Sequence, residues 1–116
     1  MLRWLTAFLL TLAIELPVAG ILLRRHEASR AALAGKLFFA NLATHPLVWF
    51  AFPLLPGSWA ATTALSEIFA CLTEAAFFAL IIPGVKPGRA MLVSLAANCA
   101  SFGLGLLFFL LLPWRD

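Results

Sequence analysis

Long apolar stretches, separated by short polar segments, run through the whole chain. Four of them reach the roughly 20 mostly apolar residues that a helix needs to cross a bilayer, and they cover residues 4–23, 33–53, 59–82 and 89–112. The segments between them are short, which places successive helices side by side and antiparallel. We therefore predict an all-α integral membrane protein, in which residues 1–116 form one domain, a transmembrane four-helix bundle of two helical hairpins.

Composition excludes an ordinary soluble domain. Hydrophobic residues make up 64% of the chain and charged residues only 11%, whereas soluble domains carry about 25% charged residues. The net charge is +3, but no basic run is long enough to suggest a nucleic-acid partner. The expected partner is the lipid bilayer, whose anionic headgroups the basic residues would contact.

Basic residues are divided unevenly between the two sides of the predicted bundle. The first and third connecting regions hold Arg24, Arg25, Arg30, Lys36, Lys86 and Arg89, against Arg3 and Arg115 on the other side. The positive-inside rule therefore places loops 24–32 and 83–88 in the cytoplasm and both termini outside, and we expect a prokaryotic cytoplasmic membrane. The tryptophans, which favour membrane interfaces, all fall at the outer ends of the spans: Trp4, Trp49, Trp59 and Trp114.

Polar side chains inside the spans fall at matching depths. With a helical rise of about 1.5 Å per residue, each span has one polar residue about 12–14 Å from the cytoplasmic side, namely Glu15, Asn41, Glu74 and Asn98. Polar groups facing lipid would lack hydrogen bonds, so these four faces are expected to meet on one axis. Nearer the outside, His45 and Glu67 form a second tier. The predicted proton- or substrate-binding residues are Glu15, Asn41, Thr44, His45, Glu67, Glu74, Asn98 and Ser101.

A five-residue pattern recurs in the second and fourth spans. Residues 40–44 read Ala-Asn-Leu-Ala-Thr, and residues 97–101 read Ala-Asn-Cys-Ala-Ser. Each asparagine is preceded, one span earlier, by a glutamate of the polar layer, Glu15 or Glu74. We therefore predict an internal repeat, with two like hairpins related by an axis along the membrane normal.

The polar layer suggests proton-linked chemistry. Two glutamates that face each other away from water can share a proton, a coupling suited to transport, while asparagines and hydroxyls supply hydrogen bonds to carboxylates, water or substrate. Pro17 and Pro46 are expected to kink helices beside this site, as in the interrupted helices of transporters. Proton-linked binding or translocation of a small solute or ion is the first prediction, and a pathway through so narrow a bundle is expected to need a homo-oligomer.

Other interpretations stay open. In an accessory or assembly subunit of a larger membrane complex, the polar layer would serve helix packing, and a lipid-facing phenylalanine stripe would meet a partner: Phe38, Phe39, Phe77, Phe78, Phe108 and Phe109. A bound lipid or transition metal is a further alternative, with His45, Glu67, Cys71 and Glu74 as candidate metal ligands. An enzyme has the least support, and no catalytic residue is predicted.

The cysteines and two of the glycines within the spans are expected to have structural roles. Cys71 and Cys99 lie within spans, so both are expected to be buried thiols and not a disulfide. Gly103 and Gly105 are expected to permit close helix packing.

The chain also resembles two groups of small membrane proteins. The run Asn41-Leu42-Ala43-Thr44-His45-Pro46, preceded by Glu15-Leu16-Pro17 and followed by the Ala-Asn-x-x-Ser of the fourth span, resembles small uncharacterised prokaryotic four-span proteins with an N-L-x-T-x-P motif, to which no activity is attached. In length, span number and first-span glutamate, the chain is similar to the small multidrug resistance transporters. That likeness is one of format, since the chain has no tyrosine and lacks their aromatic and glycine pattern. It implies only that Glu15 is a proton site.

Overall fold

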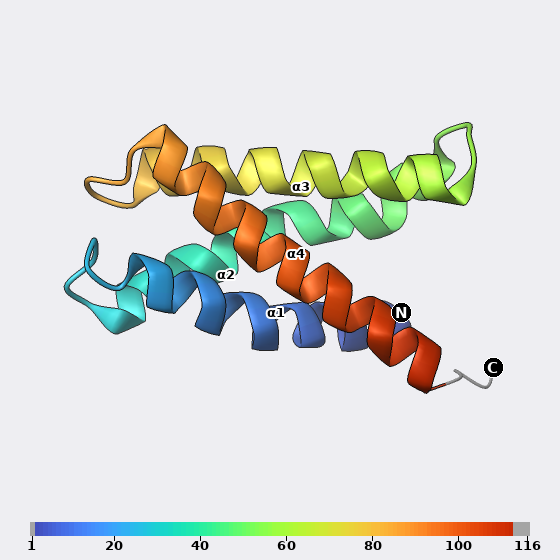
Figure 1. Ribbon diagram of the computed structural model, residues 1–116, viewed down its shortest axis with the longest axis horizontal. Coiled ribbons are helices and arrows are strands. Elements are labelled where there is room, and N and C mark those ends of the chain that lie inside the picture. The colour runs from blue at the N-terminus through green and yellow to red at the C-terminus, as the bar shows by residue number, and fades with distance from the viewer. Residues whose placement is uncertain (1, 113–116) are drawn as a thin grey trace.

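The computed structural model describes residues 2–112, and all the regular structure in this range is helical (Figure 1). Its elements are α1 (Leu2–Leu23), α2 (Arg30–Pro46), the π-helical turn η1 (Leu47–Ala51), the 3₁₀ turn η2 (Phe52–Leu54), α3 (Trp59–Ile81) and α4 (Pro87–Leu111). The all-α four-helix bundle is thus confirmed. Trp114 and Arg115, which were assigned to the outer side, lie outside the described residues.

Local sequence explains where the helices begin and end. Ser29 and Ser58 cap α2 and α3, each accepting a hydrogen bond of 3.1 Å from a backbone N–H in the first helical turn, which satisfies a donor that the helix leaves free. Pro87 starts α4, where its missing N–H costs nothing. Gly84 turns the connector before α4 with φ of 72°, a conformation that residues with a side chain rarely adopt.

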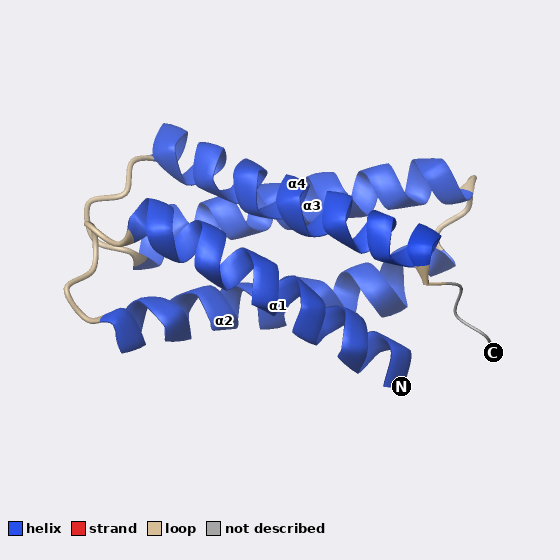
Figure 2. Cartoon of the chain, turned by 60° about the horizontal axis from the view of Figure 1, so that its bottom comes forward, coloured by secondary structure: helices blue, strands red, loops and turns tan. Residues whose placement is uncertain are grey.

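Each of the four spans is long and apolar enough to cross a membrane, counting α2, η1 and η2 as one span from Arg30 to Leu54. The chain is an integral membrane protein. Its connectors α1–α2 and α3–α4 lie together at one end of the bundle, here called the connector end, while Leu2, Leu111 and the α2–α3 connection lie at the opposite terminus end (Figures 1 and 2). In Figure 1, α4 crosses the bundle diagonally, from α3 at the connector end toward α1 at the terminus end.

An apolar plug fills the connector half of the bundle. It consists of buried residues from all four helices and the α3–α4 connector: Ala19, Leu23, Leu33, Leu37, Ala40, Ala75, Phe78, Ile82, Val85, Ala90, Val93 and Ala97. Phe78 is only 1% exposed, so its assignment to a lipid-facing stripe was wrong. Beyond Asn98, by contrast, no described residue of α4 is buried.

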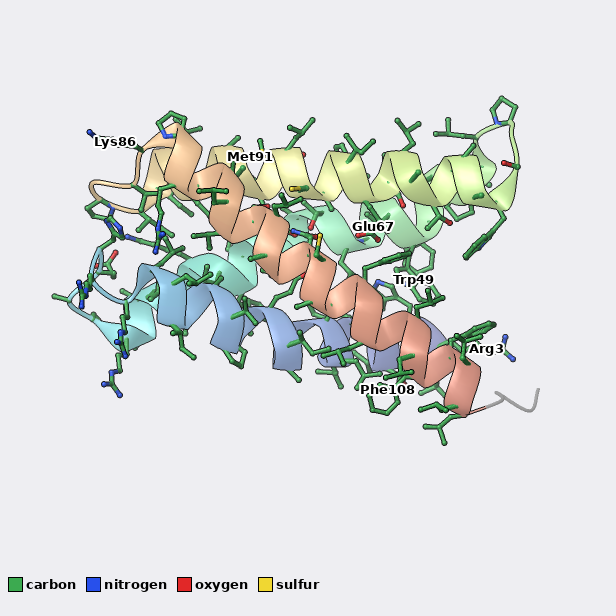
Figure 3. All side chains as sticks on the ribbon, in the orientation of Figure 1. Arg3, Trp49, Glu67, Lys86, Met91 and Phe108 are labelled. Carbon is green, nitrogen blue, oxygen red and sulfur yellow. The ribbon has the colours of Figure 1, made fainter. Side chains whose placement is uncertain are left out.

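Polar contacts tie the connector end together. Lys36 forms an ion pair with Glu27, and the Arg89 guanidinium donates a 3.1 Å hydrogen bond to the backbone carbonyl of Leu22, at the end of α1. Figure 3 shows the nitrogen-bearing side chains gathered at this end, with Lys86 labelled, and Arg3 at the other. The connector end is therefore closed both by apolar packing and by a link between α1 and α4.

Two expectations about small residues are wrong. Cys99 is exposed on the outside of α4 instead of buried. A side-chain carbon placed at Gly103 or Gly105 would meet no atom within 4 Å, so neither glycine permits a close helix contact. Both lie in the part of α4 beyond Asn98, where no described residue is buried.

Candidate functional site

The four residues predicted to share one depth do meet inside the bundle. Glu15 on α1, Asn41 on α2, Glu74 on α3 and Asn98 on α4 are all buried, and the two glutamates are only 3% and 2% exposed. They lie immediately beyond the apolar plug, on its side toward the terminus end. We refer to them, with the hydroxyls of Thr44 and Ser101, as the polar layer.

Glu74 has both carboxylate oxygens engaged. The Thr44 hydroxyl donates to Oε1 over 2.9 Å, and the Asn98 amide donates to Oε2 over 2.8 Å. Hydrogen bonds of this kind make burial of a carboxyl group tolerable. Glu74 is thereby connected to α2 and α4 at once, which fixes how three helices pack.

Glu15 is only half satisfied. Its Oε1 accepts a 2.5 Å hydrogen bond from the Ser101 hydroxyl, and the Asn41 side chain also interacts with this carboxyl group. Its Oε2 is buried without a hydrogen-bond partner among the described residues. The Glu15 and Glu74 carboxyl groups are close enough to interact electrostatically. Glu15 is therefore the member of the pair with an acceptor to spare.

Hydroxyl groups link the two hairpins in the same way. Thr44, in the first hairpin, donates to Glu74 in the second, and Ser101, in the second, donates to Glu15 in the first. Each hydroxyl also lies within hydrogen-bonding distance of the backbone carbonyl of the asparagine three residues earlier, at 3.3 Å and 3.1 Å. Thr44 and Ser101 therefore occupy equivalent positions in the two contacts.

The two asparagines are held by equivalent bonds as well. The Asn41 amide donates to the carbonyl of Leu37 over 3.1 Å, and the Asn98 amide donates to the carbonyl of Ser94 over 2.9 Å, each four residues back along its own helix. These bonds fix which end of each amide carries the donors. The side-chain oxygens of both asparagines are left without donors from the described residues.

His45 lies among aromatic rings at the α1–α2 contact. Its ring centroid is 5.1 Å from that of Phe8 and 6.2 Å from that of Trp49, while its Nε2 is 3.5 Å from the Thr11 hydroxyl. Its Nδ1 is buried without a partner among the described residues. Directly after it, Pro46 ends the α-helical pattern and η1 follows as a π-helical turn, a deviation often found at functional sites.

The helix backbone differs at Pro17 and Pro46. The irregular backbone predicted at Pro46 is present as η1, whereas α1 runs without interruption through Pro17 to Leu23. His45 and Trp49, which lie on either side of the start of η1, both line the same cavity.

A cavity of about 690 Å³ extends from the polar layer to the terminus end. Its floor holds the polar layer, and its outer part is lined by Trp49, Pro53, Trp59 and Phe109. It therefore lies on one side of the apolar plug only. All eight predicted site residues line it: Glu15, Asn41, Thr44, His45, Glu67, Glu74, Asn98 and Ser101.

Glu67 stands apart from the hydrogen-bonded layer. It is half-buried on α3, interacts electrostatically with Glu74, and has no hydrogen bond to any other described residue. In Figure 3 it points from α3 into the bundle, toward the region of Trp49. A second, mostly apolar groove of about 490 Å³ runs between α3 and α4 and shares Glu67, Asn98 and Phe102 with the cavity. Glu67 thus lies where the cavity meets this groove.

The candidate metal ligands are not brought together. The described residues contain no group of three or more histidine, cysteine, aspartate or glutamate side chains that could hold a metal ion. Cys71 instead packs against α4, where the Ser94 hydroxyl donates to the Cys71 carbonyl over 2.7 Å and lies 3.6 Å from its sulfur. The metal interpretation finds no support in this geometry.

Two polar residues of the site region were missed. Thr63 and Ser66 line the cavity about two turns and one turn before Ala70, respectively. The spacing of Thr63, Ser66 and Glu67 on one helical face could have identified both. No protein family, curated protein or solved structure matches the chain.

The bond from Thr44 to Glu74 offers a direct test of the polar layer's contribution to stability. Thr44→Val removes the hydroxyl with little change of shape and leaves Oε1 of Glu74 without its donor, so we expect a loss of about 1–2 kcal/mol in the free energy of unfolding. Thr44→Ser keeps the donor and should lose less. Unfolding in mixed detergent micelles measures both, and equal stability of the two variants would contradict the bond's role.

Proposed function

We propose that the protein binds a small solute at the polar layer and couples its passage across the membrane to protons. The observation that carries this proposal is the one-sided cavity, which ends on two interacting buried glutamates. Carboxyl groups buried in a membrane protein are costly and typically belong to substrate paths or proton relays. A layer that served packing alone would leave no open volume in front of it.

The arrangement suggests how the coupling works. A solute that enters from the terminus end meets Glu67 and then the polar layer, where it competes with protons for the carboxylates of Glu15 and Glu74. Release on the other side requires the apolar plug to open, together with the contact between Arg89 and the Leu22 carbonyl. Opening one side while closing the other is alternating access.

Orientation and symmetry form part of the same proposal. The positive-inside rule assigns the connector end to the cytoplasm, so the cavity faces the outside. The equivalent bonds of Thr44 and Ser101, and of Asn41 and Asn98, support a repeat of two like hairpins. The expected location is a prokaryotic cytoplasmic membrane, and the expected assembly is a homo-oligomer.

Reconstitution tests the function. Vesicles that contain the purified protein are given an imposed pH gradient and a panel of labelled small cations, neutral amides and carboxylates. We expect at least one of them to accumulate against its concentration gradient and to leave when a proton ionophore collapses the pH gradient. Failure of every class, in vesicles where the folded protein is present, would remove the proposal.

One observation supports the alternative function, that of an accessory subunit. Phe39 is more than half exposed, and Phe38 and Phe108 are also exposed; none of the three lines the cavity, so a partner protein could cover them. Purification in a mild detergent distinguishes the two functions. A stoichiometric larger partner would favour the subunit, and a self-contained oligomer would favour the carrier.

Thiol labelling tests the orientation of the cavity. In a background carrying Cys71→Ala and Cys99→Ala, we expect Thr63→Cys, on the cavity wall, to react with a membrane-impermeant maleimide added to the outside of intact cells. Val93→Cys, in the apolar plug, is the matched control and should react from neither side. Labelling of Thr63→Cys only in inverted vesicles would reverse the orientation.

A further inference from the structure

The balance of hydrogen-bond donors and acceptors around the cavity floor narrows the class of solute. We infer that the site takes a protonated primary or secondary amine with an apolar body. This inference rests on the proposed function for its biological meaning, but it concerns binding and can be tested without transport. It follows from four properties of the cavity: its hydrogen-bond donors are mostly engaged, some of its acceptors are free, its ionisable groups are mainly carboxyl groups, and its wall is apolar.

Donors of the polar layer are already used inside the protein, whereas the buried Nδ1 of the neighbouring His45 has no partner among the described residues. The Thr44 and Ser101 hydroxyls donate their single hydrogens to Glu74 and Glu15. The Asn98 amide donates to Glu74 and to the carbonyl of Ser94, and the Asn41 amide donates to the carbonyl of Leu37. A ligand that needed several donors, such as a carboxylate or a phosphate, would have to break these bonds.

Acceptors are in excess. Oε2 of Glu15 is buried with no donor from the described residues, and the side-chain oxygens of Asn41 and Asn98 also receive none. The orientation of each amide is fixed, because its nitrogen faces a group that can only accept: a backbone carbonyl for Asn41, and a carboxylate and a carbonyl for Asn98. Glu67 adds a carboxyl group with no hydrogen bond to described residues. An ammonium group carries two or three donors and no acceptor, which complements this set.

The ionisable groups that line the cavity also favour a cationic ligand. The titratable groups that face the floor are Glu15 from α1, His45 from α2, and Glu67 and Glu74 from α3, while α4 contributes only uncharged polar groups. No lysine or arginine lines the cavity within residues 2–112. An amine held here would replace a proton as the positive charge beside the carboxylates, so protons and amine should compete.

The wall of the cavity favours an apolar body. Above the polar layer, Trp49, Trp59, Phe102 and Phe109 line the cavity together with Leu106. Aromatic faces attract cations and also pack against hydrocarbon. The volume of about 690 Å³ lies within the range of sites that enclose small organic molecules.

Four probes with the same body and different head groups test the inference: benzylammonium, benzyltrimethylammonium, benzyl alcohol and benzoate. Binding to the purified protein is followed by tryptophan fluorescence, since Trp49 and Trp59 line the cavity, and by calorimetry, against empty micelles. We expect benzylammonium to bind at least tenfold more tightly than each of the other three, and its affinity to fall as the pH is lowered.

Variants locate the binding. Glu15→Gln should lower the affinity for benzylammonium at least tenfold. Glu67→Gln removes a carboxyl group that has no hydrogen bond to lose, so it should lower affinity without harming folding. Glu27→Gln makes the same change at the connector end and should bind like the unmodified protein. Equal affinity for benzylammonium and benzyltrimethylammonium, or tighter binding of benzoate, would overturn the inference.

The two proposals fail in different ways. Accumulation of an anion or a neutral solute driven by the pH gradient, together with no selective binding of benzylammonium, would overturn the amine inference and leave proton-linked transport standing. Selective binding of benzylammonium that is sensitive to Glu67→Gln, with no accumulation of any solute, would support the amine site and remove transport.

Discussion

We expect replacement of Glu15 or Glu74 by glutamine to abolish the proposed proton-linked accumulation of solute in reconstituted vesicles. Glutamine keeps the size and most of the hydrogen-bonding capacity of glutamate but cannot exchange a proton. Because the two carboxyl groups interact, each variant breaks the pair, and we expect the flux to fall to that of empty vesicles in both. Uptake of the labelled solute under an imposed pH gradient is the measurement.

A matched control separates loss of function from loss of folding. Glu27→Gln makes the same chemical change at the connector end, where Glu27 pairs with Lys36 outside the polar layer. It should keep most of the flux, and all three variants should elute as the same oligomer. Undiminished flux in both Glu15→Gln and Glu74→Gln would remove these residues from the mechanism.

We expect a side chain that fills the cavity from α4 to block the proposed transport without changing a polar residue. Gly105 lines the cavity, and a side chain added there would meet no atom within 4 Å, so Gly105→Leu should fold and place its side chain in the solute's path. A cost of about 1.4 kcal/mol in binding already corresponds to a tenfold loss, and we expect the flux to fall by at least that factor.

Gly103 provides the control for this substitution. It lies two residues away on the same helix, and therefore on nearly the opposite face. It also has no atom within 4 Å of an added side chain, and it does not line the cavity. Gly103→Leu therefore makes the same change to helix propensity and faces the bilayer. Flux should be retained. Equal loss in both glycine variants would show that α4 responds to bulk in general, and not to filling of the cavity.

Hydrophobic patterning and helical depth were enough to predict the fold and the residues that meet in the polar layer. Four apolar stretches define four helices, and a fixed rise per residue aligns Glu15, Asn41, Glu74 and Asn98 at one depth. Because polar groups avoid lipid, their faces had to converge. These rules describe a single helix in a bilayer, so they can be applied to one sequence without knowing how the helices pack.

The rest depends on how the helices pack against one another. Depth alone cannot show that Thr44 reaches the glutamate of the other hairpin, or that Oε2 of Glu15 is left without a partner. The cavity is one-sided because the apolar plug fills one half of the bundle, while α4 has no buried described residue beyond Asn98 in the other half. Phe78 was misplaced for the same reason, since a phenylalanine in a span can face lipid or core, and only packing decides.

The central claim is that Glu15 and Glu74 exchange protons with the solvent through the cavity. Infrared difference spectroscopy of the protein in bilayers measures this directly and requires no knowledge of the solute, because protonated and ionised carboxyl groups absorb differently. The part of the pH-dependent carboxyl signal that comes from this pair should be lost in Glu15→Gln and in Glu74→Gln but kept in Glu67→Gln and in Glu27→Gln. A signal from the pair that is absent from the unmodified protein, or unchanged in Glu15→Gln and Glu74→Gln, would show that the pair is locked in one protonation state, as a layer that serves only packing would be.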